Sequence, residues 1–289
     1  MATTDEKNND QLINNTLDLI NRANEVFCYE VWVPSLRKNV MFREINTSQQ
    51  KRLIKSIIDS PIYNTEFIYI LKQIIDENCA DKTVSTDNLT IIDKQVIAMA
   101  MRSVSISDIV EFQIPVSEGK NVQRAISISK VLGEIKDKML VIDPIKLVDE
   151  KNVFTLECSI PTIKTEYDLE KEQRENIIID RSPQTPEQLR ETVGNMFIDE
   201  LVKYVNIVTI RINDIDNKIN FGDLKFSDRI KLMEKLPIRL VEKLLEYCNK
   251  VKEEVDKVVI FKFEVDVDKD KKETIERRLS IDGSFFINS

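Results

Sequence analysis

The residues of this sequence that could do chemistry are mainly carboxylates. Asp266, Asp268 and Asp270 occupy alternate positions, as the first ligands of an EF-hand calcium loop do. The sixth position of that loop should be a glycine but is Lys271, and the twelfth should be a bidentate acid but is Arg277. We therefore interpret the three aspartates as the solvated turn of a β-hairpin and expect no calcium site.

A second group of acids, Asp214, Asp216 and Asp223, has the ligand type that Mg²⁺ prefers. A magnesium site needs acids that converge from rigid elements, whereas these three follow a predicted strand in a polar segment, which favours a turn. A carboxylate-metal-dependent hydrolase is kept as an alternative function. We expect no metal, no other cofactor and no catalytic residue.

The 289-residue chain contains no histidine and only five glycines. Without imidazole there is no serine–histidine or cysteine–histidine couple and no histidine general base. The glycines cannot be arranged as G-x-G-x-x-G or as a P-loop anywhere in the sequence. These patterns argue against the common hydrolases and nucleotide-binding enzymes, and we expect a protein that is not an enzyme.

Composition also limits the partners and the compartment. Cys28, Cys79, Cys158 and Cys248 form no C-x-x-C pair, so we expect isolated thiols in the core. The net charge of -8, with both signs interspersed, offers no basic face for nucleic acid. Because no apolar run approaches the roughly 18 residues of a membrane span, and no secretory signal opens the sequence, we expect a cytoplasmic protein without a membrane partner.

Hydrophobic periodicity predicts an α+β fold that is predominantly helical with three β-hairpins. The hairpins are expected at 26–45, 109–128 and 258–286, and further strands at 153–160 and 207–212. The expected helices cover 9–24, 47–61, 64–79, 90–104, 162–176, 185–205, 227–236 and 237–251. The helix at 90–104 is apolar on most of its circumference, which places it in the centre of the fold.

A helix precedes both of the hairpins at 109–128 and 258–286, which predicts two related helix-then-hairpin lobes. The predicted units are an N-terminal amphipathic helix or arm over 1–25, a first lobe over 26–135 and a second lobe over 136–289, with a charged insertion at 162–186. The N-terminal helix has two interpretations, a helix packed on its own domain or an arm that binds a partner. The charged insertion is typical of a solvated helix face or, alternatively, of a docking surface.

Two aromatic segments are candidates for partner binding. Trp32 lies at strand spacing with Phe27 and Tyr29, a pattern that suits either a core or an interface hot spot. Apolar residues close to the end of the sequence must pack internally or bind a partner. The candidate partner-binding residues are Trp32, Phe285, Phe286 and Ile287.

Three stretches give the chain a likeness to a known family. They are the hairpin at 33–45 with its proline turn and basic return, the segment at 87–112 that runs through a helix into a hairpin, and the closing helix and hairpin at 244–286. In these features the chain resembles the baseplate hub and hub-assembly proteins of T-even-like contractile-tailed bacteriophages. It departs from them in the hairpin turns at 117–120 and 268–272, which lack the C-x-x-C pairs of that family.

The resemblance implies a structural or assembly protein of a phage baseplate hub that acts by protein–protein binding without catalysis. Its partners would be other hub or tail proteins, and it would act in the host cytoplasm during assembly. It would then either stay in the tail baseplate of the virion or leave as a transient tail-assembly chaperone that is absent from the mature particle.

Overall fold

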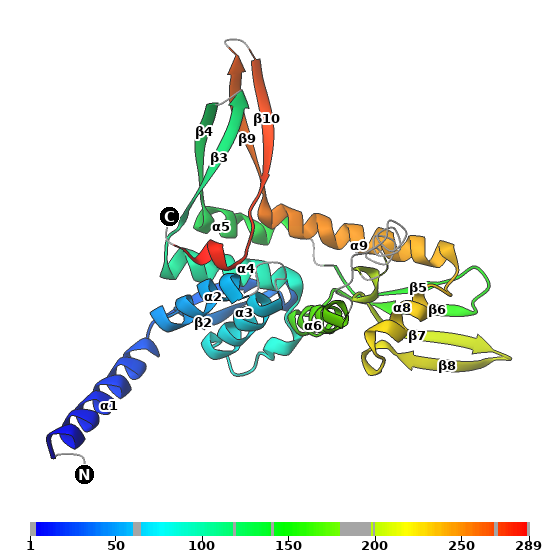
Figure 1. The fold of residues 1–289 in the computed structure, drawn as a ribbon. Helices are drawn as coiled ribbons and strands as arrows, with labels where there is room; N and C mark the ends of the chain where they lie inside the picture. The colour runs from blue at the N-terminus through cyan, green and yellow to red at the C-terminus, as the bar shows by residue number, and fades with distance from the viewer. Residues whose placement is uncertain are drawn as a thin grey trace.

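The computed structural model describes residues 4–59, 65–117, 120–139, 142–179, 198, 200–268 and 271–287. Helices and antiparallel sheets alternate along the chain (Figure 1), so the α+β class is confirmed. Most of the helix predicted at 185–205 lies outside these ranges. Within them, every helix is too short or too polar to cross a membrane.

The helices and strands include most of the predicted ones, and add the helix α5 and the strand β5 between the predicted elements at 109–128 and 153–160. The helices are α1 (Thr4–Asn24), α2 (Thr47–Asp59), α3 (Thr65–Asn78), α4 (Ile91–Ser105), α5 (Ile128–Lys138), α6 (Ile163–Ile179), α8 (Phe226–Met233) and α9 (Ile238–Val259). The strands are β1 (Cys28–Val33), β2 (Lys38–Arg43), β3 (Ile109–Ser117), β4 (Lys120–Ser127), β5 (Ile145–Val148), β6 (Phe154–Cys158), β7 (Val205–Ile212), β8 (Ile215–Asn220), β9 (Ile260–Asp268) and β10 (Lys271–Arg278). They form antiparallel pairs β1–β2, β3–β4 and β9–β10 and a four-stranded sheet of order β5-β6-β7-β8.

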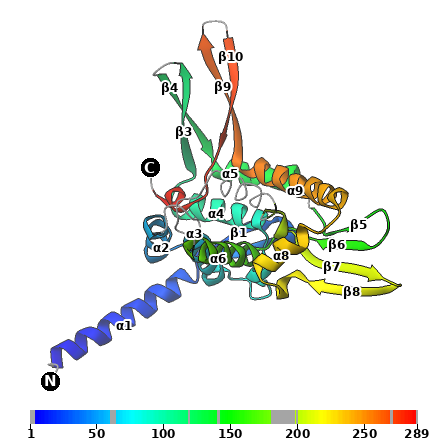
Figure 2. The ribbon, with the colours of Figure 1, turned by 45° about the vertical axis from the view of Figure 1, so that its right-hand side comes forward.

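Helix α4 lies at the centre of the molecule (Figure 2) and begins with a capping box. The hydroxyl of Thr90 accepts the backbone N–H of Asp93, and the Asp93 carboxylate accepts the backbone N–H of Thr90 in return. Most of the helix is buried, as its apolar circumference predicts. The surrounding core is one contiguous cluster that draws residues from both predicted lobes.

The two long hairpins lie beside each other. β3–β4 follows α4, β9–β10 follows α9, and both project from the same side of the body (Figures 1 and 2). They share a small apolar cluster of their own, in which Ile114, Phe263 and Val265 are buried. A helix therefore precedes each long hairpin, α4 before β3–β4 and α9 before β9–β10. Both helices contribute to the same main core. The boundary between two lobes at residues 135 and 136 stays a prediction.

Strand β8 corrects the sequence interpretation, which treated the segment after β7 as a polar loop. Asn213 and Asp214 have φ values of 51° and 64° and form the two-residue turn between β7 and β8. Such left-handed turns match the twist of a hairpin, and asparagine and aspartate tolerate them. The strand was missed because most of its side chains are exposed, so it lacks apolar alternation.

Of the two alternatives for the aromatic residues near the end of the sequence, the structure shows internal packing for Phe285 and Phe286. Phe285 and Phe286 are 5% and 0% exposed and belong to the main core, so they are not presented to a partner. The ring of Phe286 lies 6.2 Å from the ring of Phe67, and its carbonyl accepts a hydrogen bond of 2.8 Å from Gln50 of α2. Only Ile287, at 44% exposed, has its side chain on the surface among the three.

We predict that Phe286→Ala lowers the free energy of unfolding by about 3–5 kcal/mol, because it leaves a cavity in a closed core. Ile287→Ala, the neighbouring control, should change it by less than about 0.5 kcal/mol. Urea denaturation measures both. Equal and small effects would contradict the internal packing of this segment.

Candidate functional site

Helix α1 extends away from the body in both views (Figures 1 and 2). Every side chain that the structure describes between Leu12 and Ala23 is exposed. Among them are five large apolar residues: Leu12 (65%), Ile13 (55%), Leu17 (51%), Leu19 (65%) and Ile20 (49%). Of the two interpretations left by the sequence, the described side chains of α1 support the arm and show no packing of the helix on its own domain.

An isolated amphipathic helix of this kind is marginally stable in water. Helices gain most of their stability when the apolar face is packed, and the asparagines of α1 are weak helix formers. Contiguous exposed apolar surface on a monomer marks an interaction site. The exposed surface continues past the helix, because Val26 and Phe27 are 79% and 59% exposed. Helix α1 is therefore the strongest candidate for a binding surface.

Trp32 lies near the end of β1 and is half-buried against the main core. The ammonium of Lys136 lies 4.9 Å from the centre of its indole ring, a cation–π contact. Trp32 thus joins β1 to α5 within the fold. Phe27 is the aromatic residue of this segment that offers its ring to solvent.

The paired hairpins form a second projecting feature. The ring of Phe112 lies 5.9 Å from that of Phe261 and 5.3 Å from that of Phe263, so aromatic packing joins β3 to β9. On the exposed side, Lys262 and Glu276 form a cross-strand ion pair of 2.8 Å. The two hairpins therefore have a common apolar interior and charged outer surfaces.

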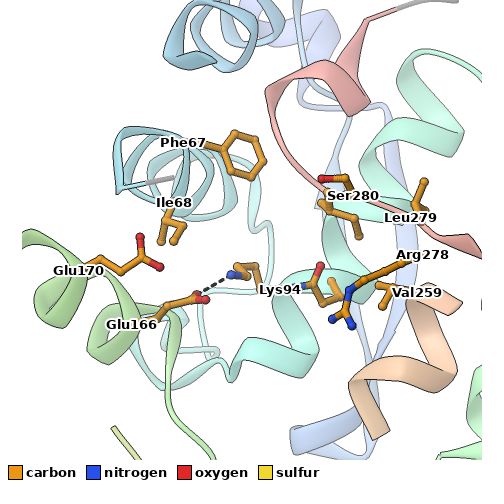
Figure 3. A pocket seen from close by; sticks show the side chains of 11 residues that line it. Phe67, Ile68, Lys94, Glu166, Glu170, Val259, Arg278, Leu279 and Ser280 are labelled. Atoms are coloured by element: carbon orange, nitrogen blue, oxygen red, sulfur yellow. Dashed lines mark hydrogen bonds and ion pairs between the residues drawn. The ribbon is translucent and has the colours of Figure 1, made fainter. Parts of the chain in front are cut away.

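A cluster of charged residues lines a cavity of about 470 Å³ between α3, α4, α6 and the end of β10. Lys94 of α4, whose side chain is 8% exposed, forms an ion pair with Glu166 of α6. Figure 3 shows the carboxyl group of Glu170 turned toward the same lysine from the next turn of α6. Arg278 also lines the cavity, but its guanidinium is bound to Asp256 at 2.8 Å.

Glu170 has unusual acid–base behaviour. Burial, reinforced by the negative charge of Glu166, raises the pKa of Glu170 to about 7. Such a carboxyl group is a candidate general acid or base. The cations that act on it, however, are held by other acids: Lys94 by Glu166, and Lys203 by Glu200. The arrangement suits an electrostatic connection between α4 and α6 better than catalysis.

The acids considered as metal ligands are not brought together in the part of the chain that the structure describes, where no group of three potential metal ligands occurs. Asp214 lies in the turn before β8, and Asp216 pairs with Arg211 at 2.7 Å. The side chains of Asp266, Asp268 and Asp270 lie outside the described residues.

All four cysteines are free, and Cys79, Cys158 and Cys248 are buried. Burial raises the pKa of both Cys158 and Cys248 to about 12. These thiols remain protonated at neutral pH and are poor nucleophiles, because the thiolate is the reactive form. Their environment is that of core residues.

The chain matches no protein family, no curated protein and no solved structure. The functional argument therefore rests on its own residues and geometry. The likeness to phage hub proteins depends on the three sequence stretches alone.

We predict that Glu170→Gln raises the free energy of unfolding by about 1–2 kcal/mol at pH 8 and leaves that free energy unchanged near pH 4. Residual contact of the side chain with water limits the gain at pH 8. In the wild type, the folded state retains a proton up to about pH 7, whereas the unfolded chain loses it near pH 4. Wild-type stability therefore falls through this window, and glutamine removes that loss.

Denaturant unfolding at both pH values measures the difference between variant and wild type. Glu246→Gln, at an exposed position of α9, is the matched control and should stay within about 0.5 kcal/mol of wild type throughout. A Glu170→Gln effect that is the same at pH 4 and pH 8 would contradict the raised pKa.

Proposed function

We propose that this chain is a structural or assembly protein that acts by binding other proteins and performs no catalysis. The observation that carries the proposal is α1, which exposes five large apolar side chains by 49–65% and stands clear of the body. A helix of this kind binds by laying its apolar face into a groove or against other helices. The burial of that face would supply the binding free energy.

The paired hairpins support the same function. They project from the body, and the outer edges of two-stranded sheets offer backbone donors and acceptors to a partner. Their common aromatic interior keeps them together as one arm. An arm of this kind and a free helix are features of a protein that connects others.

The resemblance in the stretches 33–45, 87–112 and 244–286 supplies the identity of the partners. On that basis, the protein belongs to the baseplate hub of a contractile-tailed phage and binds hub or tail proteins in the host cytoplasm. The same surfaces also suit a tail-assembly chaperone that leaves before the virion matures.

We predict that the chain, co-expressed with the hub and tape-measure proteins of its phage, is captured with at least one of them. Leu19→Asp should reduce capture by at least about tenfold, because it places a charge in the apolar face of α1. Asn15→Asp introduces the same side chain on the polar face and should leave capture unchanged. Affinity purification followed by quantitative mass spectrometry measures all three.

Failure to capture any of these proteins, together with normal tail assembly in a phage that lacks the gene, would reject the proposed function. Mass spectrometry of purified virions then separates the two forms of the proposal. Presence in the particle identifies a resident hub subunit, and absence identifies a chaperone.

A further inference from the structure

Strand β8 forms one edge of the four-stranded sheet (Figures 1 and 2), and most of its side chains are exposed. The direction of its backbone groups follows from a hydrogen bond of β7. The N–H of Arg211 donates to the carbonyl of Val153 on the β6 side at 2.8 Å, so it points away from Asp216, its opposite residue in β8. Because this direction alternates along an antiparallel ladder, the backbone groups of Asp216, Lys218 and Asn220 point to the open edge. A further strand can bond to these groups.

We propose that two copies of this chain pair their β8 strands antiparallel, about a two-fold axis at Asn217, and so join their sheets into one. The inference goes beyond the proposed function, because this contact uses neither α1 nor the long hairpins. A two-fold dimer uses the same surface on both copies. Each residue of β8 therefore lies opposite the residue at the same distance on the other side of the axis, and Asn217 lies opposite its own copy.

The sequence of β8 is complementary to itself about Asn217. Asp216 and Lys218 lie one residue to either side, so each acid faces a lysine of the copy. Ile215 and Ile219 lie two residues to either side, so isoleucine faces isoleucine. Opposite charges and apolar pairs directly across an antiparallel ladder stabilise it, whereas like charges destabilise it.

The neighbouring registers lack this complementarity. An axis at Asp216 would oppose two aspartates, and an axis at Lys218 would oppose two lysines. An axis at Ile215 would bring an aspartate of the turn against Asp216, and an axis at Ile219 would leave only the end of the strand in contact. The backbone could bond in each case, so the side chains select the register at Asn217.

The charges also favour a copy of this chain as the occupant of the edge. Asp216 is held by Arg211 of its own hairpin at 2.7 Å, whereas Lys218 has no ion-pair partner among the residues that the structure describes. The copy brings a carboxylate directly opposite each Lys218. Each Asp216 then lies between the guanidinium of its own chain and the ammonium of the other. An acid and a lysine at mirrored positions are what a second β8 strand requires.

The same pairing covers apolar surface at the tip of the hairpin. Ile212 and Ile215 flank the turn and are 57% and 65% exposed, although they lie on the sheet face that carries the buried Val208. In the dimer, Ile215 lies beside Ile219 of the copy, on the same face. Association therefore removes from water side chains that the single chain leaves exposed.

Sedimentation equilibrium of the full-length protein tests the proposal through an exchange of charges. We expect a wild-type mass of twice 33.6 kDa at about 100 µM chain. Lys218→Glu and Asp216→Lys each oppose like charges at two places and should each weaken association by at least about tenfold. In an equal mixture, the acids of the first variant face the lysines of the second, so the mixture should recover the wild-type mass. That recovery also shows that both variants are folded.

Disulfide cross-linking tests the register without changing a charge. Asn217 lies opposite its own copy in a non-hydrogen-bonded pair, with about 4.5 Å between the Cα atoms, which a disulfide can span. Mild oxidation should therefore join Asn217→Cys chains into covalent dimers. Ile215→Cys, the control in the same hairpin, has its copy on the far side of the axis and should stay unlinked. The wild type gives the background of the four native cysteines.

A monomeric wild type would overturn the pairing, as would a dimer whose mass neither charge variant lowers. Cross-linking of Ile215→Cys in place of Asn217→Cys would overturn the register. A mixture that stays monomeric while both variants keep the wild-type thermal unfolding would also contradict it. None of these substitutions alters α1, so the capture of hub proteins tests the proposed function separately.

Discussion

A helix that is buried on almost every side must find partners for its charged residues, because an unpaired buried charge costs several kcal/mol. Helix α4 contains three such residues, Asp93, Lys94 and Arg102, with exposed fractions of 0%, 6% and 3%. Asp93 caps the helix and also accepts the backbone N–H of Ser35 at 3.0 Å, which holds the turn between β1 and β2. Lys94 pairs with Glu166 and so fixes α6 against α4.

Arg102 connects the other end of α4 to the hairpins and to the closing segment. Its guanidinium donates to the carbonyls of Ile109, where β3 begins, and of Ile287, and it lies over the ring of Phe285 at 5.2 Å. Burial lowers the pKa of this arginine, but the group stays charged at neutral pH. The three charged residues thus order the body around α4. Helix α1 and the outer parts of the hairpins are left to project from this rigid support, which suits them for binding.

Local patterns predicted much of this arrangement, because most elements depend on the spacing of their own apolar residues. The central position of α4 followed from its apolar circumference, and the long hairpins from the alternation of apolar and polar residues along most of their length. Strand β8 was missed because its stability comes from pairing with β7 and not from its own residues. The burial of Phe285 and Phe286 and the raised pKa of Glu170 depend on contacts between distant segments, which periodicity does not contain. For α1, the sequence predicted the helix but left open what its apolar face meets.

The central claim is that the apolar face of α1 is free in the single chain and becomes covered by association. Hydrogen exchange of the backbone amides between residues 12 and 24, followed in the protein alone and in its complex with a captured partner, tests it most directly. The account predicts rapid exchange in the protein alone and strong protection in the complex, with α4 protected in both. Equal protection of α1 in the two samples would show that the helix packs on its own body, and would contradict the account.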